Sequence, residues 1–157
     1  MHLYYTRISE QPSRRMQQEA EHRAGRALLC HVLGCGEKDI HIHENGKPYL
    51  PGGPCFSISH SGGLILLAVS DLGEIGCDVE ESARAVRNPE AIRRKIAGPG
   101  EEEIPLLELW VKKEAEYKAG GPGSMYYPAM PEGFIAAVCC RAEEKPVPAK
   151  EVCNNMP

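Results

Sequence analysis

The stretch GEIGCDVEES, residues 73–82, begins as an apolar strand and ends on two acidic side chains. Side chains of a strand alternate between its two faces, so Asp78 and Glu80 share one face with Gly76. Two neighbouring carboxylates on one face repel each other. Either the strand ends there and both acids face solvent, or a cation such as Mg²⁺ holds them together.

The composition is that of a globular protein with a slightly acidic surface. The chain has 157 residues, of which 42% are hydrophobic and 25% charged, and these proportions argue against disorder. This length supports one substantial core or two small lobes. The net charge of −4 argues against a general nucleic-acid binder, because such proteins neutralise phosphates with a basic surface. We expect no nucleic-acid partner.

Several features indicate the cellular compartment. No apolar run approaches the roughly 18 residues of a membrane-spanning helix. Residues 1–15 lack the apolar middle of a signal peptide. The seven cysteines contain no C-x-x-C pair and are expected to be reduced thiols. We therefore expect a cytoplasmic protein with no membrane partner.

Strand and helix patterns alternate along the chain. Strand patterns cover residues 2–6, 39–43, 55–59, 64–70, 74–80, 132–141 and, as an edge strand, 145–153; helix patterns cover 13–34, 88–97 and a segment from near Pro105 to Gly120. This order predicts an α+β fold, with long helices packed on antiparallel strands. We expect residues 1–157 to form a single domain with approximate lobes 1–70 and 71–157.

The segment LWVKKEAEYKAGG contains a candidate third metal ligand. On a helix, Trp110, Glu114 and Lys118 stand at i, i+4 and i+8 and form one stripe. In one interpretation, Glu114 and Lys118 form an exposed ion pair beside a tryptophan packed on the core. In the other, Glu114 joins Asp78 and Glu80 in a Mg²⁺ site, since Mg²⁺ prefers carboxylate oxygens, and Lys118 binds a substrate phosphate.

Two further features are suited to binding an anion. The strand end FSISHSGG, residues 56–63, presents hydroxyls, an imidazole and glycines that can cradle phosphate oxygens. Ser59 and His60 point to opposite faces of a strand, which argues against a catalytic Ser–His pair. Lys113 lies about 100° round its helix from Glu114 and either binds the same anion or faces water.

In this order, GKPYL, FSISHSGG, IGCDVE and WVKKEAEYKAGG resemble the motifs of the 4′-phosphopantetheinyl transferases, most closely those of the Sfp-type class. That family carries a G-[IV]-D-x-E strand and a W-x-x-K-E-x-x-x-K helix, which here are residues 76–80 and 110–118. The resemblance implies the family fold of two pseudo-symmetric α+β lobes. It also implies an enzyme that transfers 4′-phosphopantetheine from coenzyme A to a serine of an apo acyl or peptidyl carrier protein. Mg²⁺ would be the cofactor, and adenosine 3′,5′-bisphosphate would be released.

The resemblance also implies roles for single residues. Asp78, Glu80 and Glu114 would bind Mg²⁺. Glu114 would also orient or deprotonate the incoming serine, and Lys118 would stabilise or protonate the leaving phosphate. The groups implied to bind the phosphates of coenzyme A are Lys47, Ser59, His60, Lys113 and Lys118, with Arg23 and Arg14 for the 3′-phosphate. For both arginines, a solvated helix face is the alternative.

The chain departs from the family in one region. Residues 81–109 form a shorter segment than family members usually have, and the resemblance implies that this region contributes to docking of the carrier protein. A monomer with two lobes is expected. The competing hypotheses are a non-catalytic module of the same fold that binds coenzyme A or a nucleotide, and a structural α+β domain with surface acids.

Overall fold

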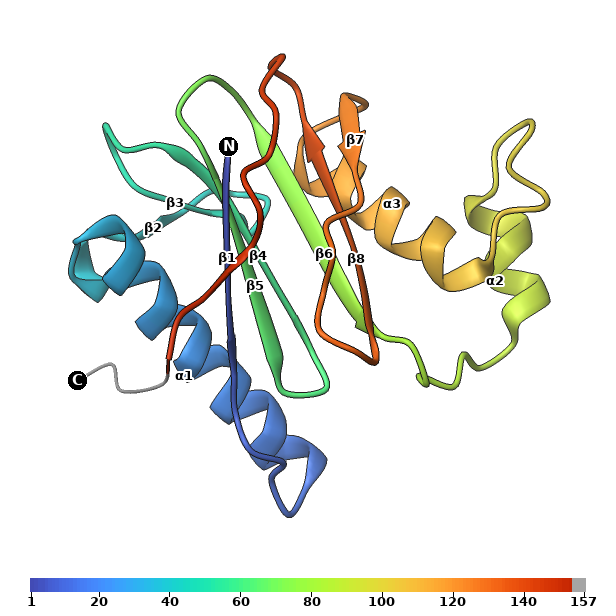
Figure 1. Cartoon of the computed structure of the whole chain (residues 1–157), viewed down its shortest axis with the longest axis horizontal. Coiled ribbons are helices and arrows are strands. Elements are labelled where there is room, and N and C mark those ends of the chain that lie inside the picture. The colour runs from blue at the N-terminus through green and yellow to red at the C-terminus, as the bar shows by residue number, and fades with distance from the viewer. Residues whose placement is uncertain (154–157) are drawn as a thin grey trace.

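Helices and strands follow one another in the α+β order that the sequence predicts, in a computed structural model that describes residues 1–153 (Figure 1). The elements are β1 (His2–Arg7), α1 (Arg14–Leu33), the 3₁₀ helix η1 (Glu37–Asp39), β2 (His41–Ile42), β3 (Pro48–Tyr49), β4 (Cys55–Ser61), β5 (Leu64–Ser70), β6 (Ile75–Glu81), α2 (Pro89–Ile96), α3 (Leu106–Lys118), β7 (Ser124–Tyr126), β8 (Phe134–Cys140) and β9 (Lys150–Glu151). The sequence did not predict η1 or β7. No helix within residues 1–153 is long and apolar enough to cross a membrane.

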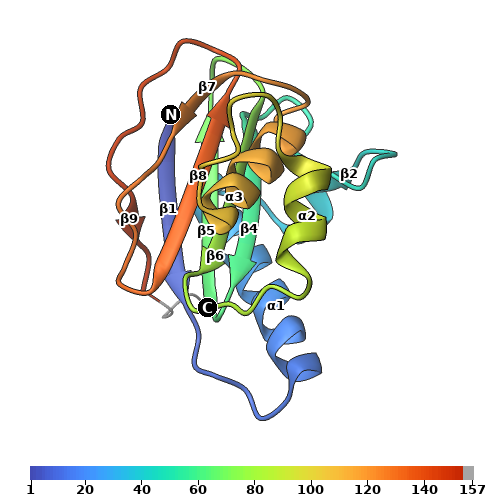
Figure 2. The same cartoon turned by 90° about the vertical axis from the view of Figure 1, so that its right-hand side faces the viewer.

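The strands form two main sheets and one small hairpin. The first sheet has the strand order β4-β5-β1-β9, the second has the order β6-β8-β7, and β2 pairs with β3. The pairings are antiparallel except that between β1 and β9, which is parallel. Helix α1 packs on the first sheet and α3 on the second, while α2 lies against α3 on the outside (Figure 2).

Local sequence fixes both ends of α1. The hydroxyl of Ser13 accepts a hydrogen bond from the N–H of Met16, and Gly34 ends the helix in the left-handed conformation at φ 63°. The buried positions of α1 are Glu21, Gly25, Leu28 and Leu29. A carboxylate therefore lies on the face that packs on the first sheet.

The serines of β4 join the two sheets. Alternate hydroxyls of β4 accept hydrogen bonds at 3.0–3.4 Å from alternate N–H groups of β6: Ser57 from Cys77, Ser59 from Val79, and Ser61 from Glu81. The pairs advance in the same direction along both strands, so β4 and β6 run parallel. Serine hydroxyls here replace the backbone carbonyls that accept these bonds in an ordinary parallel pair.

Strand β5 contributes to the core on both of its faces. Its odd-numbered residues 65, 67 and 69 pack in one cluster with Leu28 and Leu29 of α1. Its even-numbered residues 64, 66 and 68 lie in a second cluster with side chains of β6 and β8. The first and second sheets therefore share one core, with α1 and α3 on opposite outer sides (Figure 1).

Candidate active site

Helix α3 crosses β6 with its backbone close to Gly76. A Cβ atom at this position would lie 2.1 Å from the carbonyl oxygen of Ala115 and 2.5 Å from the amide nitrogen of Ala119. Only glycine permits so close an approach of helix backbone to a strand. The glycine that opens the G-x-D-x-E pattern therefore sets the distance between the acids of β6 and the last turn of α3.

This crossing joins Lys118 to Asp78. The ammonium group of Lys118 donates to Oδ1 of Asp78 at 2.7 Å and to the carbonyl oxygen of Cys77 at 3.1 Å. The hydroxyl of Ser59 donates to the same Oδ1 at 2.7 Å. Oδ2 of Asp78 is buried and has no hydrogen-bond partner among residues 1–153. One oxygen of this carboxylate is thus fully engaged, and the other is free to accept a further ligand.

Burial affects both members of this ion pair. It raises the pKa of Asp78 above its usual value, and the charge and hydrogen bonds of Lys118 and Ser59 only partly offset this effect. Burial lowers the pKa of Lys118, but the surrounding negative charges, first that of Asp78, outweigh it and hold the pKa above its usual value. Lys118 therefore stays charged, and Asp78 is the member that takes up a proton as the pH falls.

Glu80 has a different cationic partner. Its Oε2 accepts a hydrogen bond from the hydroxyl of Ser61 at 2.8 Å, and its Oε1 forms an ion pair with the guanidinium of Arg84. That guanidinium lies over the ring of Trp110, 5.8 Å from the centroid. Arg84 was not predicted from the sequence, in which its signal is a positive charge four residues after Glu80.

The predicted metal ligands are only partly brought together. Asp78 and Glu80 share one face of β6, as predicted, and both are buried. Glu114 is half-buried on α3, and its negative charge contributes to the raised pKa of Lys118. Within residues 1–153, no group of three or more His, Cys, Asp or Glu side chains is arranged to hold a metal ion. Asp78 and Glu80 are instead paired with Lys118 and Arg84.

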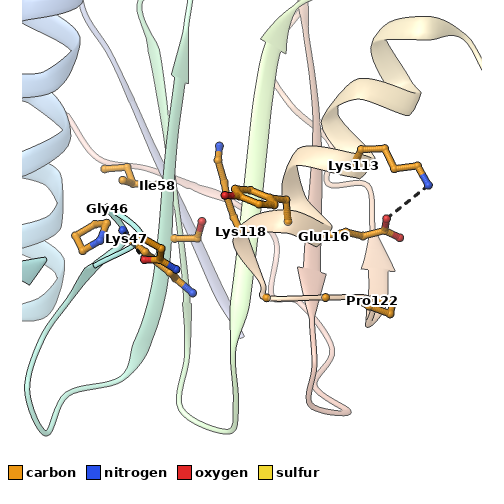
Figure 3. Close-up of a pocket in the computed structure, with 13 residues that line it drawn as sticks. Gly46, Lys47, Ile58, Lys113, Glu116, Lys118 and Pro122 are labelled. Atoms are coloured by element: carbon orange, nitrogen blue, oxygen red, sulfur yellow. Dashed lines mark hydrogen bonds and ion pairs between the residues drawn. The ribbon is translucent and has the colours of Figure 1, made fainter. Parts of the chain in front are cut away.

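An open cleft of about 780 Å³ lies between the β2–β3 hairpin and the C-terminal half of α3 (Figure 3). It brings together three of the predicted phosphate ligands, Lys47, Lys113 and Lys118. Lys47 forms an ion pair with Glu74 at 2.7 Å and donates to the carbonyl oxygen of Ile75 at 3.2 Å. Figure 3 shows Lys47 and Lys113 on opposite sides of the cleft, with Lys118 between them.

Glu101, in the segment before α3, pairs with two neighbouring lysines of that helix, of which Lys113 lines the cleft. It forms ion pairs with both Lys112 and Lys113, the latter at 2.7 Å. Hydrogen bonds from Lys112 first, and then from Lys113, lower the pKa of Glu101 to about 2. Lys113 thus lines the cleft with two acids already beside it, Glu101 and, at 3.8 Å, Glu116. Glu101 was not predicted from the sequence, because it lies in a run of three acids without periodicity.

His60 lies in a second cleft of about 490 Å³, which shares Gly46, Pro48 and Ile58 with the first. Nδ1 of His60 is 2.8 Å from Oε2 of the buried Glu21. Oε1 of Glu21 also accepts from the backbone N–H of Gly63 at 2.9 Å, which explains how a carboxylate is tolerated on the buried face of α1. Ser59 points the other way, toward Asp78, so Ser59 and His60 lie on opposite faces of β4 as predicted.

The arginines predicted for the 3′-phosphate line neither of these clefts. Arg14 lines a separate hollow at the start of α1, beside Gly62 and Glu81. Arg23 is exposed two residues after the buried Glu21, which places it on the opposite side of the helix. Arg26, which was not singled out, lines the second cleft with His60.

Sequence comparisons agree with these motifs. Over 115 aligned positions the chain is 36% identical to the 4′-phosphopantetheinyl transferase AcpT of Escherichia coli O157:H7, an alignment that covers 62% of this chain and 56% of the relative. This chain is similar in sequence to the 4′-phosphopantetheinyl transferases. The transferase AcpT of Salmonella typhimurium strain LT2 is 34% identical over 110 positions, covering 62% of this chain and 57% of the relative.

The family resemblance predicted from the motifs is thereby confirmed. The chain spans about half the length of the curated relatives that it matches. No protein-family profile matches the chain. The relatives' names specify the transferase family, and the Sfp-type class stays a prediction.

Proposed function

We propose that this chain transfers the 4′-phosphopantetheine group from coenzyme A to a serine of an apo acyl or peptidyl carrier protein, with Mg²⁺ as cofactor. The observation that carries the proposal is the crossing at Gly76, where α3 brings Lys118 to the buried Asp78 beside a cleft lined by three lysines. The likeness to the 4′-phosphopantetheinyl transferases named AcpT supports it. Because the chain spans about half of those relatives, the complete reaction needs a direct test.

The acids of β6 are suited to a divalent cation. In the part of the chain that the structure describes, Oδ2 of Asp78 is buried without a partner, so its lone pairs are available. Asp78 and Glu80 would hold Mg²⁺, with Glu114 of α3 as a third ligand, because this ion prefers carboxylate oxygens completed by phosphates and water. When bound, the ion would neutralise the charge of the pyrophosphate of coenzyme A.

The lysines would bind the coenzyme. Lys47, Lys113 and Lys118 line one cleft, which suits a pyrophosphate with several negative charges. The adjoining cleft, with His60 and Arg26, would take the 3′-phosphate. Ser59 would hold the carboxylate of Asp78, to which its hydroxyl donates, and would not contact the coenzyme.

In the proposed reaction, the serine oxygen of the carrier attacks the β-phosphorus of coenzyme A. A phosphorus–oxygen bond to the serine forms as the bond to the departing adenosine 3′,5′-bisphosphate breaks. The proton of the serine passes to the carboxylate of Glu114, directly or through water. Lys118, which Asp78 keeps positively charged, stabilises or protonates the leaving phosphate.

We further propose that residues 1–157 form one domain of two pseudo-symmetric lobes, 1–70 and 71–157. The same strand order in both halves supports this. In the first half, β1 pairs antiparallel with β5, and β5 also pairs with β4. In the second half, β6 pairs antiparallel with β8, and β8 also pairs with β7. Strand β9 departs from the symmetry because it pairs with β1.

A carrier-loading assay tests the activity. The chain is incubated with Mg²⁺, a fluorescent coenzyme A analogue and a small panel of apo carrier proteins, and Mg²⁺-dependent transfer of the label is expected. Glu114→Ala should lower the rate by about 100-fold or more, the size of a general-base contribution. Glu108→Ala is the matched control, since Glu108 is an exposed acid in the first turn of the same helix.

Two outcomes would contradict the proposal. A fully active Glu114→Ala variant would exclude Glu114 as base and metal ligand. Mg²⁺-dependent binding of coenzyme A by calorimetry, without transfer to any carrier, would favour the non-catalytic coenzyme A-binding module. The chain covers only part of its relatives, which is the specific reason to measure binding and transfer separately.

A further inference from the structure

Arg84 is a cation that the proposed reaction does not use, although it contacts a proposed metal ligand. Its guanidinium pairs with Oε1 of Glu80 and lies over Trp110, the single tryptophan of the chain. Oε2 of Glu80 already accepts the hydrogen bond of Ser61 at 2.8 Å. Oε1 is therefore the oxygen for which the guanidinium and a metal ion would compete.

The two cations beside the acids of β6 differ in how easily they can leave. The side chain of Lys118 is 28% exposed and also donates to the carbonyl oxygen of Cys77. The side chain of Arg84 is 48% exposed, and its guanidinium can return to water without leaving a buried charge of its own. Arg84 is thus the cation that a divalent ion would displace first, because Lys118 is held by two acceptors.

We propose that Arg84 is a built-in counter-ion that neutralises the buried Glu80 in the metal-free protein and competes with Mg²⁺ for it. This inference rests on the proposed metal site. Glu80 is 6% exposed, and its neighbour Asp78 is 5% exposed, so both charges need compensation at all times. Exchange of one cation for another keeps the acids compensated before and after metal binding. The ring of Trp110 supports the guanidinium in the metal-free state.

Mg²⁺ titrations of the protein alone test this inference, without coenzyme A or carrier. Calorimetry at low ionic strength should show that Arg84→Gln binds Mg²⁺ roughly two- to five-fold more tightly than the wild type, the range expected when a competing, partly exposed ion pair is removed. Arg87→Gln is the matched control, because it removes an equal charge from an exposed position in the same segment. Arg84→Lys keeps the charge without the planar group, so its Mg²⁺ affinity should lie between those of the wild type and Arg84→Gln.

Trp110 provides a readout that a purely structural role would not change. In the wild type, Mg²⁺ should alter the emission of Trp110 as the guanidinium leaves the ring. In Arg84→Gln the same titration should give little change in emission, although calorimetry reports binding. The thermal midpoint of the metal-free variant should be lower, and Mg²⁺ should raise it by more than in the wild type.

Three results would each overturn the inference. Arg84→Gln could bind Mg²⁺ no more tightly than Arg87→Gln, Mg²⁺ could change the Trp110 emission equally in the wild type and in Arg84→Gln, or the wild type could fail to bind Mg²⁺. Loading of carriers by Arg84→Gln with unchanged Mg²⁺ affinity would reject the counter-ion and leave the transferase standing. Tighter Mg²⁺ binding without loading by any form of the protein would keep the counter-ion and reject the transferase.

Discussion

Asp78 is a carboxylate whose position costs stability. It is 5% exposed, and within the described residues 1–153 only one of its two oxygens accepts hydrogen bonds, from Lys118 and Ser59. A buried charge with incomplete compensation is unfavourable, and such positions cluster at functional sites. The raised pKa of Asp78 expresses this cost, because burial disfavours the charged form more than Lys118 and Ser59 favour it.

The pH dependence of stability follows from that direction. The folded chain binds a proton at Asp78 more tightly than the unfolded chain does, where the pKa has its ordinary value of 3.8. The free energy of unfolding of the wild type should therefore rise, relative to Asp78→Asn, as the pH falls through the raised pKa toward 3.8. Urea unfolding of both proteins across this range measures the difference.

The comparison of the wild type with Asp78→Asn is needed because Glu101 changes the free energy of unfolding with pH in the opposite direction. Its pKa is lowered to about 2, so the stability that it contributes is lost as the pH falls toward that value. Glu101 is present in both proteins, and its contribution cancels in the difference. A difference that stays constant or shrinks with falling pH would contradict the assignment for Asp78.

At the scale of elements, the crossing of α3 and β6 depends on one missing side chain. In Gly76→Ala the new Cβ would meet backbone atoms of α3 at 2.1 and 2.5 Å, so the helix must move away. We expect a loss of about 1–3 kcal/mol or more in the free energy of unfolding, the usual cost of overpacking. Carrier loading should fall as well, since the shift separates Lys118 from Asp78.

A second glycine variant provides the control for this prediction. At Gly36 a Cβ would come within 3.2 Å of Asp39 Oδ2, the end of an exposed side chain that accepts the N–H of Gly36 at 2.8 Å, and φ is −88°. Gly36→Ala should therefore change stability and loading little. Denaturant unfolding and the loading assay compare the two variants, and a Gly76→Ala protein as stable as Gly36→Ala would refute the crossing as described.

Elements with local stop signals were predictable from the sequence. Helix α1 was predicted closely because Ser13 caps one end and Gly34 supplies the left-handed residue at the other. Strand β7, of three residues, was missed because it lies between Pro122 and Pro128 and is too short to show alternation.

Contacts between distant segments left no such signal. The alternating serines of β4 were read as a phosphate cradle, whereas their hydroxyls bond to the backbone of β6, and those of Ser59 and Ser61 also donate to Asp78 and Glu80. Which strand lies beside β4 depends on tertiary packing, which periodicity does not encode. For the same reason, Arg84 and Glu21 were missed as partners of Glu80 and His60.

At the scale of the whole molecule, one apolar cluster connects the two halves of the chain. It contains residues of β1 and β5 from the first sheet and of β6 and β8 from the second. The serine hydroxyls of β4 join the same sheets at their edge. Neither sheet can separate from the other without exposing this cluster, so the halves should lose their structure together.

Equilibrium unfolding tests this cooperativity. Fluorescence of Trp110, on α3 in the second half, and far-UV circular dichroism, to which the long α1 of the first half contributes, should give the same midpoint in urea. Val138→Ala, in the shared cluster, should lower the free energy of unfolding by about 2 kcal/mol. Both midpoints should therefore shift to lower urea concentration together. Leu72→Ala is the control, since Leu72 is 69% exposed and should leave both midpoints unchanged. Separate midpoints for the two signals would mean that the halves unfold independently, and the shared core would then not be the interaction that holds Asp78 of β6 beside Ser59 of β4.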